Sequence, residues 1–564
     1  MSWLKPKDPR LARLTELFFE RFFYNDLIAS EDDPQLDAAN VMAMLAFPGL
    51  LMLHWVPKYY VQLGQAPEYV RAFETFGDRF FWLSFQMGVL ALVATLQWER
   101  FYPERRDYAI LGPQPVSIAE LFGAQARALV RFLGLFFLLV NGFAALFFPL
   151  AMVPYRASLS AGLVFTFGHW LCLIASAAAA FAFVGCIQGM LIAALPSRWY
   201  QRFSTVFQSL LAASLILFIV AIPVLRSHLL AGSSTVAELV GSSNWLWVLP
   251  PAWFAAFGEW AAGRNVELFE PLALKALFSL ASAVCLFVGA YLLTYRRFVA
   301  HSLEGPAVSK NREARLGAVA RSLLRRWWLR DSLQYATFFF TLRMLVRSGP
   351  HRLYVGGYLA AGCGGVFSQL WTASNRGDMA DVLLQQPYIV LFLVVAGMRN
   401  AFSIPADLTA NWAFRFNLQP TPGRYLEGVR KALWTAAPLP LAVISSATAY
   451  VFVSPYAALV RLPVFLLACC FTSEAVMWRL SKIPFTCRYL AGRAHVIILW
   501  TSLIIGMFLY SSWFASMEER AFAHPWDSAG LLLLLPLLLR YARSPASELR
   551  FEDTDPFIEP LRLS

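Results

Sequence analysis

The sequence predicts an all-α, polytopic membrane protein with about twelve transmembrane helices. Of its 564 residues, 58% are hydrophobic and only 15% are charged, whereas about a quarter of a soluble domain is charged. Apolar runs recur along the chain at the length of roughly 20 residues that a helix needs to cross about 30 Å of hydrocarbon. These runs lack the two-residue alternation of a membrane β-strand, so we expect helices throughout.

The apolar runs form two sets of six. The first set predicts spans near residues 39–57, 80–98, 132–152, 161–195, 204–225 and 273–295. The second set predicts spans near 353–372, 386–404, 432–453, 456–478, 495–515 and 527–540. Residues 158–195 are long enough for two short helices, but a single helix places 37 Lys and Arg on the N-terminal side of the membrane and 10 on the other. Because Lys and Arg concentrate in cytoplasmic loops, we expect one long helix there and cytoplasmic N- and C-termini.

A basic segment joins the two halves. We assign residues 1–298 to a first six-span half with an N-terminal interfacial helix, 299–335 to a basic cytoplasmic linker, and 336–564 to a second six-span half. Trp327 and Trp328 among the linker arginines fit a helix at the membrane surface, and a solvated linker fits equally well. The net charge of +12 indicates orientation and contact with anionic head groups rather than nucleic-acid binding.

Each half begins with an amphipathic stretch whose apolar residues recur every three or four positions, the pattern of an interfacial helix. In the first half these residues are Leu11, Leu14, Phe18 and Phe22. In the second half they are Tyr335, Phe339, Leu342 and Val346.

A polar turn, which we call the elbow, separates the second and third predicted spans of each half. Both elbows contain Leu-x-Pro-x-Pro, followed five positions later by Glu. The first, "ERRDYAILGPQPVSIAELF", has Pro113, Pro115 and Glu120, and the second, "NWAFRFNLQPTPGRYLEGV", has Pro420, Pro422 and Glu427. A further turn between the fourth and fifth spans carries Pro196 and Arg198 in one half and Pro484 and Arg488 in the other. These correspondences, in the same order, indicate an internal duplication.

Sequence motifs for catalysis and for nucleotide or metal binding are missing. The chain has no GxxxxGK[ST] phosphate loop, no HExxH and no GxSxG, so we expect no catalytic, cofactor or metal residues. Glu474 and His169 are the only ionisable groups expected inside the membrane, and Glu474 is expected to pair with Arg479 or Lys482. The mid-membrane amides are expected to link helices. They are Gln86, Asn141, Gln188 and Gln208.

Three segments together resemble one known family. "ERRDYAILGPQPVSIAELFGAQ" is similar to the cytoplasmic loop of type-two ATP-binding-cassette (ABC) exporter permeases, in which a charged stretch precedes a proline turn and a coupling helix. "LWVLPPAWFAAF" resembles that family's outer Pro-Pro-x-Trp-Phe segment, and "FTLRMLVRSGPHRLYV" resembles its interfacial helix. The resemblance implies a permease that binds no cofactor itself and is driven by separate ATPase subunits that bind ATP and Mg.

The resemblance also implies a set of coupling contacts on the elbows. In the first elbow these are Glu104, Arg105, Arg106, Asp107, Pro113, Pro115 and Glu120. In the second they are Arg415, Pro420, Pro422, Arg424 and Glu427, because an Asn-Trp-Ala-Phe stretch replaces the charged cluster. Pro196, Arg198, Pro484 and Arg488 form secondary cytoplasmic turns. Coupling is expected to be stronger in the first half.

Other functions remain open on the sequence. A secondary, ion-coupled transporter requires buried ionisable residues, and a membrane-embedded lipid- or glycan-processing enzyme requires a cluster of acid, base or metal-binding groups; a non-transporting scaffold requires neither. The expected location is the bacterial inner membrane, with the lipid bilayer and ATPase subunits as partners. The apolar, aromatic interior suits lipids, drugs, peptides or lipid-linked glycans as the transported substrate.

Overall fold

The computed structural model describes residues 8–22, 45–102, 107, 110–111, 113–153, 158–264, 266–303, 324–326, 328–374, 379–406, 422–477, 483–486, 496–524, 526 and 530. Within these ranges the regular structure is helical and contains no strand. Eight helices in the described part of the chain are long and apolar enough to cross a membrane. They coincide with eight of the twelve predicted spans, so the chain is an all-α, multi-pass membrane protein.

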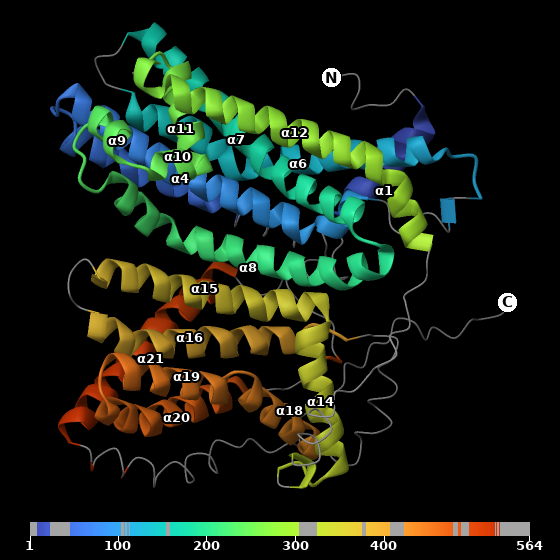
Figure 1. Cartoon of the computed structure of the whole chain (residues 1–564), viewed down its shortest axis with the longest axis vertical. Helices are drawn as coiled ribbons and strands as arrows, with labels where there is room; N and C mark the ends of the chain where they lie inside the picture. The colour runs from blue at the N-terminus through green and yellow to red at the C-terminus, as the bar shows by residue number, and fades with distance from the viewer. Residues whose placement is uncertain are drawn as a thin grey trace. The chain divides into compact units, whose positions relative to one another are not determined.

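The chain divides into two compact units, residues 1–307 and 308–564. The division falls within the segment assigned as the basic linker, of which residues 304–323 and 327 lie outside the described ranges. Figure 1 shows unit 1 in blue to green and unit 2 in yellow to red.

Unit 1 is built on five long helices. They are α4 (Glu68–Leu96), α6 (Ile118–Met152), α7 (Leu159–Ala194), α8 (Ser197–Leu230) and α12 (Val266–Leu303). The amphipathic helix α1 (Pro9–Arg21) lies at one end of this bundle, and three short helices lie at the other (Figure 1). The short helices are α9 (Val236–Ser242), α10 (Trp245–Val248) and α11 (Pro250–Ala261). We call these two ends the elbow end and the far end.

Of two predicted spans of unit 1, one forms a single long helix and the other is irregular. The run at 158–195 forms the single 36-residue helix α7, as the Lys and Arg distribution predicted. The run at 39–57 is not one uniform α-helix in its described part. It passes through 3-10 turns in η2 (Leu51–His54) and a short α3 (Trp55–Pro57) into π turns in η3 (Lys58–Gln62). Pro57 lacks a backbone N–H donor, which interrupts the regular α-helical bonding at this point.

The described residues of unit 2 include seven helices of 15 or more residues. They are α14 (Ser332–Arg347), α15 (Gly349–Ser374), α16 (Met379–Phe402), α18 (Pro422–Ala436), α19 (Pro438–Phe452), α20 (Pro455–Met477) and α21 (Val496–Ala523). The predicted span at 353–372 lies within α15, and the span at 495–515 lies within α21 except for residue 495, which is outside the described residues. The span at 432–453 is broken at Ala437, which precedes Pro438. Apart from Gly530, the span at 527–540 lies outside the described residues.

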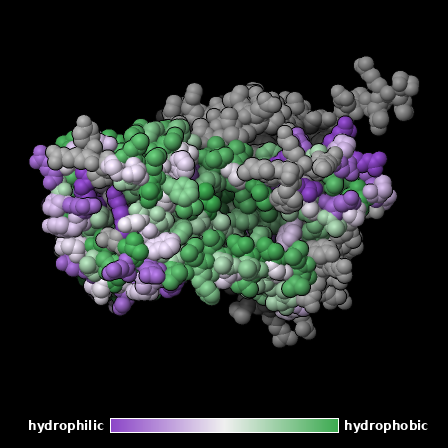
Figure 2. Space-filling model, turned by 90° about the horizontal axis from the view of Figure 1, so that it is seen from above, coloured by the Kyte–Doolittle hydropathy of each residue, from purple (hydrophilic) through white to green (hydrophobic). Residues whose placement is uncertain are grey.

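Apolar side chains cover the outer surface of the long helices as well as their contacts. Phe278, Leu293 and Leu459 are among the large apolar side chains that stay exposed. The face shown in Figure 2 is hydrophobic in its middle and hydrophilic toward its two ends. This distribution is the one that lipid contact around the middle of the helices requires.

Candidate functional site: the two elbows

The first elbow leads into α6 through a complete N-terminal cap. The Ser117 side chain accepts a hydrogen bond from the Glu120 backbone N–H at 3.2 Å, and the Glu120 carboxylate accepts from the Ser117 backbone N–H at 2.8 Å. This capping box satisfies N–H groups that have no partner within the helix. Pro113 and Pro115 lie exposed just before it. The two prolines therefore precede a helix start that is fixed in direction.

Helix α1 packs along the start of α6. The predicted apolar face of α1 is confirmed, because Phe18 and Phe22 are buried and the Phe22 ring stacks on Phe132 of α6 at 4.6 Å. At the edge of this contact Arg131 pairs with Glu16 at 3.0 Å. The first elbow helix thus has an amphipathic partner packed against it.

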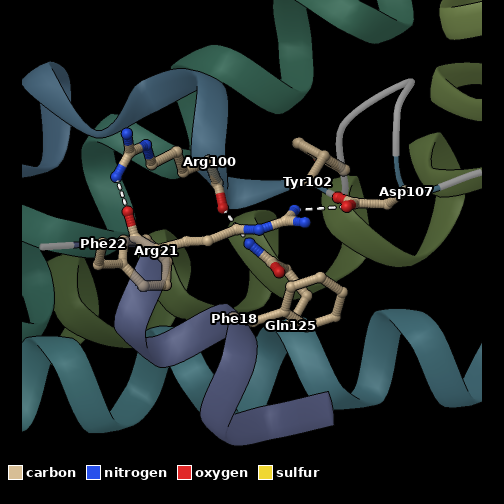
Figure 3. Close-up of a pocket in the computed structure, with 7 residues that line it drawn as sticks. All are labelled: Phe18, Arg21, Phe22, Arg100, Tyr102, Asp107 and Gln125. Carbon is tan, nitrogen blue, oxygen red and sulfur yellow. Dashed lines mark hydrogen bonds and ion pairs between the residues drawn. The ribbon is translucent and has the colours of Figure 1, made fainter. Parts of the chain in front are cut away.

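A polar cluster ties the C-terminus of α1 to the elbow (Figure 3). Arg21 pairs with Asp107, Arg100 donates to the Arg21 carbonyl, and Gln125 donates to the Arg100 carbonyl. Gln97 donates to the Phe22 carbonyl at 3.4 Å. The last carbonyls of a helix have no partner within it, so the side chains of Arg100 and Gln97, which donate to two of them, stabilise the end of α1.

Asp107 is buried, whereas a residue that contacts a docking partner should be exposed. Its side chain is only 3% exposed and is occupied by Arg21. Asp107 holds the elbow against α1, whereas Glu120, Pro113 and Pro115 remain on the surface. Glu104, Arg105 and Arg106 lie outside the described residues.

The second elbow has the same kind of partner helix. Asp331 caps α14 by accepting from the Leu333 N–H at 2.8 Å, and its other carboxylate oxygen pairs with Arg424 of α18 at 3.2 Å. Gln334 donates to Glu427 and accepts from Lys431 at 2.7 Å. Glu427 thus binds α14.

A glycine makes the approach of α14 and α18 possible. A Cβ atom at Gly428 would overlap the Thr337 hydroxyl and lie 2.9 Å from the Gln334 carbonyl oxygen. Arg415 and Pro420 lie outside the described residues, and only the backbone of Pro422 is described, as the first residue of α18.

The second pair of predicted turns also meets the elbow helix in unit 2. The Pro484 carbonyl accepts from the Tyr425 hydroxyl of α18 at 3.0 Å. Next to it, Phe485 has a positive φ of 66° and is fully buried. Its backbone bonds to Phe402 and Ala406 at 2.9 Å each. A bulky residue in this backbone region is strained and is held by its surroundings.

In unit 1 the corresponding turn is simpler. Pro196 directly precedes α8 and is exposed, as is Trp199. The Arg198 side chain and the whole of Arg488 lie outside the described part of the chain.

The sequence missed two buried ion pairs, one in each unit. Arg79 of α4 lies 2.7 Å from Glu259 of α11 in unit 1, with side chains 0% and 2% exposed. In unit 2, Arg461 of α20 lies 2.7 Å from Glu518 of α21, and both side chains are 0% exposed. The expectation that Glu474 and His169 are the only ionisable groups inside the membrane is therefore wrong, because Arg79 and Arg461 lie in helices that are candidate membrane spans. Pairing removes much of the cost of burying each charge, and pairing across helices is not visible in a single apolar run.

Glu474 and His169 themselves have structural neighbours. Glu474 pairs with Arg430 of α18 at 3.1 Å, while Arg479 and Lys482, its expected partners, lie outside the described residues. The His169 ring is fully buried and stacks on Phe148 at 4.3 Å.

The mid-membrane amides link helices, as predicted. Gln86 donates to the Leu173 carbonyl of α7 at 2.8 Å. Asn141 of α6 accepts from Trp82 of α4 at 3.3 Å. The remaining two donate to backbone carbonyls on or next to α4: Gln188 to Trp98 at 2.7 Å and Gln208 to Thr95 at 2.9 Å.

The chemistry that these groups support is structural. In the described part of the chain, no group of three or more His, Cys, Asp and Glu side chains is placed to hold a metal ion. The charged and polar groups of the elbows form interhelical pairs, caps and exposed surface.

Comparison of the chain with models of protein families, with curated proteins and with solved structures gives no match. The fold and the elbows define the chain as a helical, multi-pass membrane protein with two compact units.

Proposed function

We propose that the chain is the permease of an ABC exporter, driven by separate ATPase subunits that dock on its elbows. The observation that carries this proposal is the shared construction of the two elbows. In each unit an amphipathic helix, α1 or α14, packs on the helix that follows the elbow and is bound to it by charged side chains. A force applied to such an elbow would move two helices together, because packed interiors deform little.

Under this proposal the elbow end is cytoplasmic, as are both termini, and the membrane is the bacterial inner membrane. The two units are the products of the internal duplication, and the transported substrate crosses the membrane through the permease that they form. The first elbow is the docking surface: the resemblance assigns Arg105 and Arg106 to it, and Pro113, Pro115 and Glu120 are exposed on it. Asp107 holds the first elbow against α1, and Glu427 holds the helix that follows the second elbow against α14.

The test is a charge reversal in the first elbow. Arg105→Glu with Arg106→Glu should abolish co-purification of an ATPase and the ATP turnover of the purified complex, because docking needs the basic pair. The matched control is Arg343→Glu with Arg347→Glu, at two exposed positions of α14. This variant changes the net charge by the same amount and should leave ATPase recovery and ATP turnover intact. Unchanged ATPase recovery and turnover in the elbow variant would refute docking at this site.

A second candidate, an ion-coupled transporter, is favoured by the two buried ion pairs. Such carriers keep ionisable groups inside the membrane because they use them. Transport in reconstituted vesicles separates the candidates: flux that follows an ion gradient without ATPase subunits favours the carrier. Flux that requires the ATPase and ATP favours the permease.

A further inference from the structure

Three charged side chains at the far end of unit 1 line one cavity without pairing with each other. Glu68 and Arg71 project from the first turn of α4, and Arg264 lies between α11 and α12. The cavity has a volume of about 510 Å³, within the range of small-molecule sites. Its apolar lining includes Met152, Val236 and Leu268.

Neighbouring charges at the same end are paired. Lys58 binds Glu74 at 2.8 Å and Asp78 at 2.7 Å, and Arg226 binds the same two carboxylates at 3.2 and 2.8 Å. By contrast, neither Glu68, Arg71 nor Arg264 forms an ion pair within the described ranges. The charged side chains that join the helices here are therefore paired, whereas the three that line the cavity are not.

The two arginines retain donors for a ligand. Arg71 donates from Nη1 to the Leu63 carbonyl at 3.1 Å, and its Nη2 forms no hydrogen bond among the described residues. The Arg264 guanidinium lies over the Phe165 ring at 4.7 Å, which occupies its face and not its N–H edges. Burial lowers the pKa of Arg264; the carboxylates of Glu259 and Glu68 raise this pKa, and the guanidinium groups of Arg79 and Arg71 lower it further. An anion between the two guanidinium groups would accept hydrogen bonds from their free N–H donors and offset the repulsion between the two positive charges.

We propose that this cavity binds a zwitterion that carries a phosphate and an ammonium group. The phosphate lies between Arg71 and Arg264, and the ammonium pairs with Glu68, which is exposed at the mouth of the cavity. Met152, Val236 and Leu268 contact an apolar part of the ligand. This chemistry is that of a zwitterionic phospholipid head group and also of free phosphoethanolamine. The site is separate from the elbows and does not depend on the permease proposal.

The test measures binding to the full chain, purified in detergent, by isothermal titration calorimetry. The probes are a short-chain phosphatidylethanolamine, soluble phosphoethanolamine and inorganic phosphate. Arg264→Gln and Glu68→Gln should each weaken binding of the zwitterion by about tenfold or more, because each removes a charge-assisted contact. Glu267→Gln is the matched control, since Glu267 is exposed at the same end but does not line the cavity.

A second variant tests the cavity without changing its charge. Ala72→Phe places a ring in the lining and should weaken every probe that binds there. Binding of the lipid alone supports a lipid head group, and binding of both zwitterions with similar affinity supports a small soluble ligand. Inorganic phosphate binding as tightly as the zwitterions, equal effects of Glu68→Gln and Glu267→Gln, or no binding of any probe would overturn the proposal.

Discussion

Separating the buried pair of Arg461 and Glu518 should strongly destabilise unit 2. The Arg461 Nε lies 2.7 Å from Glu518 Oε1, and the Tyr388 hydroxyl donates to Glu518 Oε2 at 2.6 Å. Removing one partner of a buried pair costs about 3–5 kcal/mol, because the other charge is left buried and uncompensated. Arg461→Met and Glu518→Leu should each lower the free energy of unfolding by about this amount.

The two single variants should lower the free energy of unfolding by different amounts. Glu518→Leu also leaves the Tyr388 hydroxyl without its acceptor, which adds about 1–3 kcal/mol. The double variant should cost far less than the sum of the singles, since replacing both charges by apolar groups leaves no charge unpaired. Unfolding in mixed micelles, titrated with SDS, measures these free energies. Glu519→Leu, at the exposed neighbouring position, should have little effect.

Additive single and double variants would refute this reasoning. An interaction energy below about 0.5 kcal/mol would mean that the two groups behave as independent sites. The burial of the pair would then contribute nothing specific to the stability of unit 2.

Two further predictions concern the second elbow helix, α18, and the turn that contacts it. Gly428→Ala should separate α18 from α14, because the added methyl group would overlap Thr337. We therefore expect a lower thermal midpoint of unfolding for this variant. Gly365→Ala is the control and should change the midpoint little, because Gly365 has open space around it. Phe485→Ala should lower the unfolding free energy by about 3–5 kcal/mol, the usual cost of deleting a buried aromatic side chain. The same substitution at the exposed Phe508 is the control, and equal effects at the two positions would show that Phe485 does not hold the turn.

Much of the fold follows from local sequence. Hydrocarbon thickness sets the length of a spanning helix, so long apolar runs were sufficient to locate eight spans. The capping box of Ser117 and Glu120 depends on residues three positions apart, and it lies at the predicted elbow. The apolar face of α1 was predicted for the same reason, since side chains three and four residues apart share one face of a helix. The predicted count of twelve spans goes beyond the eight candidate spans found among the described residues.

The partners of these elements depend on the tertiary structure. Asp107 was expected to be a coupling contact, yet it is buried and pairs with Arg21, which lies 86 residues earlier in the chain. Arg461 appears as a lone charge in "YAALVRLPVFLLACC", and its partner Glu518 is 57 residues away. A local pattern records hydrophobicity and helical spacing, whereas the free energy of a buried charge is decided by the group that packing brings against it. The sequence by itself therefore determined a membrane-spanning helical chain with two proline elbows, and only the tertiary structure decided which charges are buried, paired or left facing a cavity.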